Sequence, residues 1–351
     1  MSKPAARRST SKPARTVPAS TLAVPDRSWV LTEQRNPRSR RLHALSLNAC
    51  VNLIQREDAR VFAAVREAAA RRSLARFIAA AAKGFVAQPP AGVDAARHPG
   101  RLIYVGAGTS GRLGVLDASE APPTFQVPHG RIVGIIAGGD RSLRFSSEGR
   151  EDEPDGALAD LRALRLTGRD AVLGIAAGGT TPYVLGALAI AKRLTGGSKG
   201  GCVTGLLTCS PVPRPRDVDH LIVLRTGPEV LTGSTRMKAG TATKLALNTI
   251  STTLMARSGR VYQNLMVDLR ASNAKLRDRA ARIISTITGL GRPRAFLLLD
   301  EAGGWAKLAV VMHHQAEGRA AAERVLAAAD GRLDVAMAKV EARRAKGKRP
   351  G

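Results

Sequence analysis

The stretch LIYVGAGTSGRLGVLDASE at residues 102–120 decides the fold of this chain. It begins with the apolar run at residues 102–105, which is too short for a core helix and predicts a buried strand. The run leads directly into the glycine-rich turn GAGTSGR at residues 106–112. A glycine-rich turn between a strand and a helix lets backbone N–H groups converge on an anion, because no Cβ atom obstructs the approach. The stretch therefore predicts a strand–turn–helix unit with a phosphate-binding turn.

Four further short apolar runs follow, most of them separated by segments of helical length, at residues 132–137, 171–177, 203–208 and 221–224. This alternation is typical of an α/β fold with a doubly wound, mostly parallel sheet flanked by helices. Before the sheet, we expect a helix from about residue 40 and a second, Ala-rich helix at about residues 58–85, followed by a loop at residues 88–100.

From residue 238 onward the pattern turns helical, since Leu247, Ile250 and Leu254 share one face of a helix. We expect four parts in the chain. They are a disordered basic arm at residues 1–30, an α/β domain with N-terminal helices at 31–260, a helical C-terminal region at 261–338 and a basic tail at 339–351.

Composition excludes several classes of protein. The 351 residues are 44% hydrophobic, so the chain can bury a core, yet no apolar run approaches the roughly 20 residues of a membrane span. The three cysteines are too few and too scattered for a disulfide framework or a zinc site, which fits a reducing compartment, the cytoplasm.

The net charge of +27 raises nucleic acid as a partner. However, aromatic residues make up 3% of the chain, and the dense basic runs lie in the two terminal tails. Both observations disfavour nucleic acid, because single strands are bound by stacking on aromatic side chains. A positive field also attracts small phosphorylated ligands.

The turn after the first strand also fits G-x-G-x-x-G, a pattern of dinucleotide-binding sites. Two features argue against a dinucleotide. Gly108 is followed by Thr109 and Ser110, whose hydroxyls suit a phosphate monoester, and Pro122 and Pro123 should break the long helix that a dinucleotide fold places there.

Two later segments repeat this chemistry. AGGTTPY at residues 177–183 follows the third apolar run and carries Thr180 and Thr181. GSTRMKAGT at residues 233–241 opens a helix, where Ser234 and Thr235 either cap the helix or bind an anion, with Lys238 as a cationic donor.

At these motifs the chain resembles a known family, the N-acetylmuramic acid 6-phosphate etherases, whose fold is the sugar isomerase (SIS) domain. The resemblance rests on residues 104–120 together with LTEQRNPRS at 31–39, GPEVLTGSTRMKAGT at 227–241 and NLMVDLRASNAKL at 264–276. It extends in register over about residues 31–338.

The resemblance implies a lyase of peptidoglycan and amino-sugar recycling that cleaves the D-lactyl ether of N-acetylmuramic acid 6-phosphate by elimination and then hydration. Glu120 would be the proton donor and Glu151 the base, with no metal or organic cofactor. Small and apolar neighbours of Glu120 predict a pocket that keeps its carboxyl protonated. The family also implies a homodimer whose site borrows residues from both subunits. The residues expected to bind the sugar phosphate are Gly108, Thr109, Ser110, Thr180, Thr181, Ser234, Thr235 and Lys238.

The second loop departs from the family pattern. Gly178 stands where a serine is usual, and Thr180 stands where an arginine is usual. This loss of one hydroxyl and one cation leaves an alternative open, a non-catalytic SIS-domain regulator that binds a sugar phosphate. The presence of both Glu120 and Glu151 favours the enzyme.

Overall fold

The structure is a computed structural model that describes residues 26–86, 100–197, 200–316 and 318–347. Most of the predicted basic arm, nearly all of the predicted loop at 88–100 and the last four residues of the basic tail lie outside these ranges. Within the described ranges, no helix is both long enough and apolar enough to cross a membrane.

Five parallel strands form the central sheet, in the order β2-β1-β3-β4-β5. Their bounds confirm the five apolar runs: β1 Leu102–Gly106, β2 Ile132–Ile136, β3 Ala171–Ile175, β4 Val203–Thr208 and β5 His220–Val223. Gly106 pairs with Ile136 on one side and Ile175 on the other. The carboxyl ends of β1, β2 and β3 therefore meet at one edge, where the strand order reverses between β1 and β3 and an open sheet binds its ligand.

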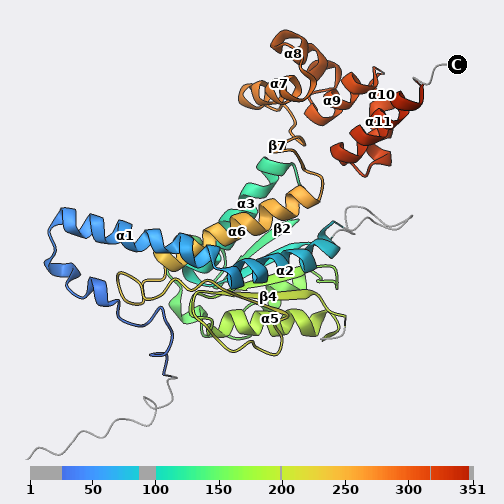
Figure 1. Cartoon of the computed structure of the whole chain (residues 1–351). Coiled ribbons are helices and arrows are strands. Elements are labelled where there is room, and N and C mark those ends of the chain that lie inside the picture. Colours follow the sequence, from blue (N-terminus) through green and yellow to red (C-terminus); the bar gives the residue numbers. More distant parts are fainter. Residues whose placement is uncertain (1–25, 87–99, 198–199, 317, 348–351) are drawn as a thin grey trace, which may run out of the picture.

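Helices cover both faces of this sheet (Figure 1). On one face lie α2 (Ala68–Phe85), α3 (Gly108–Phe125) and α6 (Lys238–Arg257), whose apolar side chains share a core with those of the strands. On the other face, α4 (Leu158–Ala163) and α5 (Pro182–Leu194) complete a second core. The doubly wound α/β prediction is confirmed.

The N-terminal helices differ from the prediction. Two 3₁₀ turns, Pro37–Ser39 and Leu42–Ala44, occupy the place of the helix expected from about residue 40. The first α-helix, α1, spans Leu47–Arg66, where the Ser46 hydroxyl caps it by accepting from the Ala49 N–H at 3.3 Å. A break at Glu67, with an extended ψ of 136°, separates α1 from α2.

The expectation that Pro122 and Pro123 break the helix after the first turn is wrong. Helix α3 continues through both prolines to Phe125 and ends at Gln126 in the left-handed conformation. Both prolines lie in the last turn of α3. The N–H groups that they lack therefore leave only two carbonyls near the helix end without an intrahelical hydrogen bond. The prolines therefore do not distinguish this fold from a dinucleotide-binding one.

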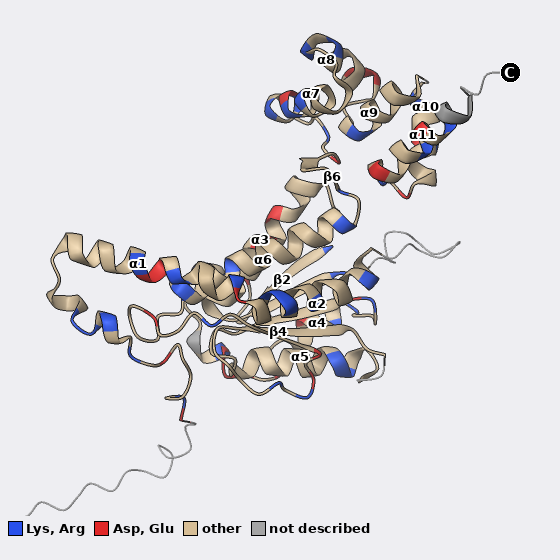
Figure 2. Cartoon of the chain, viewed as in Figure 1, with Lys and Arg blue, Asp and Glu red and all other residues tan. Residues whose placement is uncertain are grey.

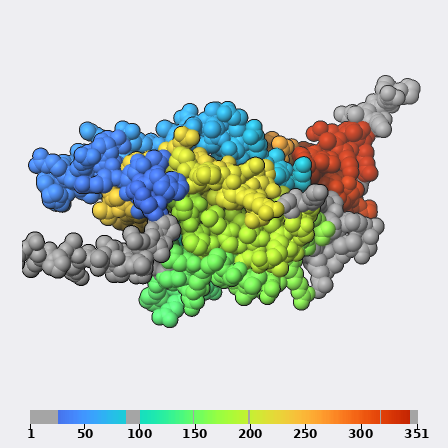
Figure 3. All heavy atoms as spheres, turned by 90° about the horizontal axis from the view of Figure 1, so that it is seen from below, coloured from blue at the N-terminus to red at the C-terminus, as the bar shows by residue number. Residues whose placement is uncertain are grey.

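Beyond α6 the described residues form a short hairpin and then five helices with an apolar core of their own. This part is orange to red in Figure 1, and the red atoms of its last helices lie toward one end of the molecule in Figure 3. The elements are β6 Val261–Tyr262, β7 Leu265–Met266, α7 Ala274–Thr288, α8 Arg292–Glu301, α9 Ala306–Gln315, α10 Arg319–Ala328 and α11 Leu333–Gly347. Asp268 joins the two parts, because it pairs with Arg260 at 3.2 Å and with Lys307.

Candidate active site

The turn between β1 and α3 has the geometry of an anion cradle. A Cβ atom on Gly106 would lie 2.6 Å from the backbone nitrogen of Gly111, so the tight turn requires glycine there, and Gly108 adopts a φ of +49°. No side chain caps α3 at its N-terminus. Thr109 and Ser110 are half-buried, and their hydroxyls have no hydrogen-bond partner among the described residues. First-turn N–H groups and two hydroxyls are thus available to a ligand.

Glu151 lies beside this cradle. A Cβ atom on Gly108 would be 3.2 Å from Oε1 of Glu151, so the carboxyl group is held next to the start of α3. The Glu151 carbonyl accepts from the Tyr183 N–H at 3.0 Å, which ties this residue to the first turn of α5. Sequence spacing alone could not place Glu151 here; only the family resemblance singled it out.

The second glycine-rich loop reaches the same edge of the sheet, at the end of β3. Gly179 has a φ of +76°, and Thr181 stands at the N-cap of α5 without a capping side-chain hydrogen bond. A Cβ atom on Gly178 would lie 3.9 Å from Oγ1 of Thr32. Thr32 is fully buried and its hydroxyl has no hydrogen-bond partner. Thr32 lies in the LTEQRNPRS motif, but no sequence pattern indicates that its hydroxyl is buried without a partner.

The third segment packs against the first turn. A Cβ atom on Gly240, in the first turn of α6, would lie 3.4 Å from Cγ2 of Thr109. The Gly233 N–H donates to the Thr32 carbonyl at 3.1 Å, so this segment also contacts the N-terminal motif. Ser234 and Thr235 are half-buried at the approach to α6. Loops that are distant in sequence therefore gather around Thr109.

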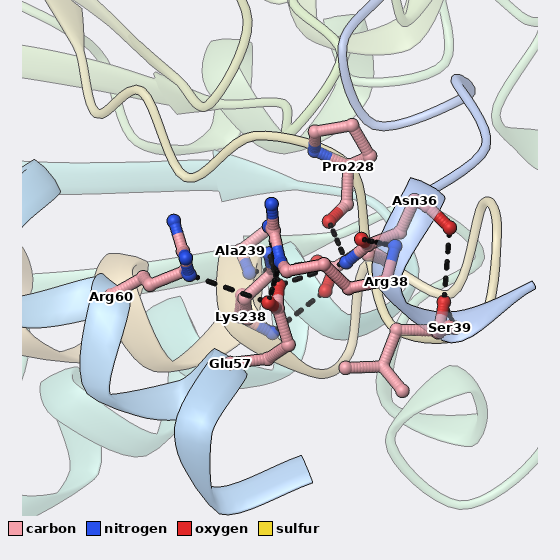
Figure 4. A network of polar contacts seen from close by, with 10 residues as sticks. Asn36, Arg38, Ser39, Glu57, Arg60, Pro228, Lys238 and Ala239 are labelled. Carbon is pink, nitrogen blue, oxygen red and sulfur yellow. Dashed lines mark hydrogen bonds and ion pairs between the residues drawn. The ribbon is translucent and has the colours of Figure 1, made fainter. Parts of the chain in front are cut away.

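The Lys238 side chain is not exposed among these loops. Its side chain is 0% exposed, and its ammonium group donates to Oε2 of Glu57 at 2.8 Å (Figure 4). The Glu57 carboxylate also accepts from Asn36 at 2.8 Å and from the guanidinium of Arg38, while Arg60 lies 3.3 Å away. Lys238 thus holds the start of α6 to α1, and the structure does not support its expected contact with a phosphate.

The acid group of Glu57 remains ionised in this enclosure. Burial would raise its pKa, but hydrogen bonds from Arg38, Lys238 and Asn36 outweigh burial and lower the pKa to about 2.

Another carboxylate caps α6. Glu229 is fully buried and accepts from the backbone N–H groups of Lys238 at 3.0 Å and Ala239 at 2.9 Å. Burial raises the pKa of Glu229 despite these two bonds. The expected capping role of Ser234 and Thr235 is therefore performed by a residue that precedes the segment, and this frees their hydroxyls.

Glu120 lies far from the cradle within one chain. Eleven residues of α3 separate it from Thr109, which corresponds to about 16 Å along the helix axis. Glu120 is exposed, so the chain does not form the expected apolar pocket around it. The reason is that α3 turns its Ala118 and Ala121 into the core and leaves Glu120 on the outward face. One hexose phosphate cannot bridge the cradle and Glu120 of the same chain.

The described residues contain no group of three or more His, Cys, Asp or Glu side chains arranged to hold a metal ion. The chain has 55 Lys and Arg against 28 Asp and Glu, and Figure 2 marks both kinds along the ribbon.

Comparison with known proteins adds independent information. Residues 89–192 match a family model described as the glucokinase regulatory protein N-terminal SIS domain. The chain is 48% identical over 321 residues to the N-acetylmuramic acid 6-phosphate etherase of Gloeobacter violaceus, covering 91% of this chain and 99% of that protein. It is 46% identical over 309 residues to the etherase of the same name from Salmonella agona, covering 88% and 98% of the two chains.

Proposed function

Since the chain belongs to the N-acetylmuramic acid 6-phosphate etherases, we propose that it cleaves the D-lactyl ether of N-acetylmuramic acid 6-phosphate, giving N-acetylglucosamine 6-phosphate and D-lactate. This is a carbon–oxygen lyase step in the recycling of peptidoglycan amino sugars. The names of the relatives favour this enzyme over the non-catalytic regulator.

The reaction begins with a proton transfer. In the open-chain sugar, Glu151 removes the acidic proton from the carbon next to the aldehyde, and the electron pair forms an enolate. The enolate expels the lactyl oxygen from the neighbouring carbon, and that oxygen takes a proton from Glu120. Water then adds to the unsaturated aldehyde, with its hydroxyl joining the carbon that lost lactate and a proton returning to the carbon beside the aldehyde.

The cradle would bind the phosphate group of this substrate. The free hydroxyls of Thr109 and Ser110 and the uncapped N-terminus of α3 supply donors, and positive partial charge at a helix N-terminus stabilises a dianion. The neighbouring loops would supply further hydroxyl donors to the phosphate, from Thr180, Thr181, Ser234 and Thr235. The position of the Glu151 carboxyl beside Gly108 is the observation that carries the proposal, because it places a base next to the phosphate site.

We further propose that Glu120 comes from a second subunit of a homodimer. About 16 Å of helix separate it from Thr109 in one chain, so the acid and the base cannot share a substrate in cis. Leu47 and Val51 at the start of α1 are 87% and 52% exposed, which supports burial of this end of the helix against a second copy. Cys50, Cys202 and Cys209 are free thiols, in keeping with a cytoplasmic enzyme.

A direct assay tests the proposed function. Purified protein given N-acetylmuramic acid 6-phosphate should release D-lactate without added metal. Glu120→Ala should stop this release, and Glu151→Ala should also stop exchange of the proton beside the aldehyde with solvent deuterium. Lactate release that survives both substitutions would disprove the assigned roles.

A further inference from the structure

A second basic pocket lies away from the glycine-rich loops. It has a volume of about 480 Å³ and is formed where α1 meets α2 and where the chain leaves β5. Its lining includes four arginines, Arg38, Arg60, Arg66 and Arg225, against one acid, Glu67. None of its lining residues belongs to the glycine-rich segments at 106–112, 177–183 and 233–241, so this pocket is distinct from the cradle at Thr109.

Two of these arginines are held in place by a buried carboxylate. Arg38 donates to both oxygens of the buried Glu57 through Nε and Nη2, and Arg60 approaches Oε1 through Nε. The terminal nitrogens of Arg60 make no bond to a described residue, and Figure 4 shows them directed away from Glu57. The carboxylate therefore fixes the orientation of the guanidinium groups without using all of their donors, which preorganises them for a second anion.

The other two arginines have no partner of their own. Arg66 ends α1, and Arg225 lies two residues beyond β5. Both are exposed, and neither forms a hydrogen bond or ion pair with a described residue through its side chain. Four guanidinium groups around one pocket repel one another, and an anion with two or more charges would relieve that repulsion.

The pocket lining contains neutral residues as well. Thr226 is 4% exposed, and its hydroxyl approaches the Cys209 thiol without forming a hydrogen bond of normal geometry. Beside it, Gly227 adopts a φ of +69° with no atom within 4 Å of the position a Cβ would take, so the lining leaves room for a ligand.

We propose that this pocket binds a small phosphorylated molecule carrying at least two negative charges, at a site separate from the catalytic cradle. Guanidinium groups bind phosphate oxygens through paired N–H donors, and the pocket volume suits a small molecule. The pocket lining contains no aromatic side chain on which a nucleic acid base could stack.

Inorganic pyrophosphate is the probe for the first experiment. Calorimetric titration should show pyrophosphate binding to the full chain, and R66A/R225A should weaken that binding at least about tenfold. The matched control is R169A/R193A, which removes two exposed and unpaired arginines elsewhere on the sheet domain and changes the net charge equally. Equal weakening by both double variants would mean that only the general positive field attracts the probe, and would overturn the proposal.

The second experiment needs no variant and distinguishes the two anion sites. Phenylglyoxal modifies accessible arginines, and mass spectrometry of the digested protein maps the modified positions. Pyrophosphate should protect Arg66 and Arg225 from modification and leave Arg169 and Arg193 reactive. Protection of none of the four, or binding of an RNA oligonucleotide in place of pyrophosphate, would refute the site. Loss of lactate release in other variants would leave this result unaffected.

Discussion

The ammonium group of Lys238 lies 2.8 Å from the carboxylate of Glu57, and both side chains are closed to solvent. Glu57 belongs to α1, while Lys238 is the first residue of α6, whose first turn packs against Thr109. The pair therefore links the N-terminal helix to the phosphate cradle through one buried contact. Because a buried ion pair is costly to break on one side only, it should be sensitive to substitution.

We predict that Glu57→Ala lowers the free energy of unfolding by about 3–5 kcal/mol, because Lys238 is left buried without an anion. Urea denaturation followed by circular dichroism measures this change. Glu301→Ala is the control, since Glu301 is exposed on α8 and forms no ion pair with a described residue. Its effect should stay within about 0.5 kcal/mol. Similar losses in the two variants would contradict the structural role of Glu57.

The same carboxylate predicts a dependence of stability on pH. Its pKa is lowered from the ordinary 4.5 to about 2, so its stabilising contribution is complete above pH 4.5 and is lost as the pH falls toward 2. The raised pKa of Glu229 acts in the opposite sense, because its ionisation opposes folding as the pH rises above 4.5. The difference in unfolding free energy between the wild type and Glu57→Gln should therefore shrink below pH 4.5. A difference independent of pH would show that Glu57 does not titrate in this way.

Gly108→Ala should reduce kcat by at least about tenfold, because the new methyl group would press on the Glu151 carboxyl from 3.2 Å and displace the base. The left-handed backbone at Gly108 adds about 1 kcal/mol of instability. Gly289→Ala is a matched control, since Gly289 after α7 has a left-handed φ of +76° but no atom within 4 Å of its Cβ position. Equal losses of kcat would assign the effect to backbone strain and not to Glu151.

Gly178→Ser should lower KM by about threefold to tenfold with little change in kcat, because it returns one hydroxyl donor to the second loop. The added Cβ would lie 3.3 Å from Cγ1 of Val30, a contact that requires a small shift, and 3.9 Å from the orphaned Thr32 hydroxyl. Steady-state kinetics on N-acetylmuramic acid 6-phosphate provides the measurement. Gly318→Ser, in open space before α10, controls for the substitution itself. An unchanged or raised KM would show that the second loop does not contribute to phosphate binding.

Mixing two inactive variants tests whether the acid and the base come from different subunits. Glu120→Ala and Glu151→Ala chains, unfolded together and refolded at equal amounts, should regain about a quarter of the wild-type activity. Half of the resulting dimers would contain both kinds of chain, and each of these dimers would have one intact site and one doubly defective site. Mass spectrometry of the intact dimers confirms that the chains have mixed. Mixed dimers without lactate release would place both carboxyl groups in one chain.

The sequence predicted the sheet well because buried parallel strands leave a strong local signal. All five apolar runs form strands. The glycines at 106, 108 and 111 indicated the turn, because its backbone conformation and close contacts fit only glycine. The start of α1 and the break at Glu67 were missed, since helical spacing of apolar residues continues across both points.

The contacts around the site could not be predicted from the local sequence. Nothing in the spacing indicates that Glu57 and Lys238, 181 residues apart, form a buried pair. A lysine in a phosphate-binding motif suggests a ligand, and only the folded chain shows that its charge is already neutralised. The distance from Thr109 to Glu120 likewise followed only once the fold showed that both residues lie on one continuous helix, α3.

The helices beyond β7 bury their own apolar side chains, and the ion pairs of Asp268 are among the contacts at their junction with the sheet domain. A separate core on each side of the junction allows the helical part and the sheet domain to open in separate steps, because loss of one core leaves the other buried.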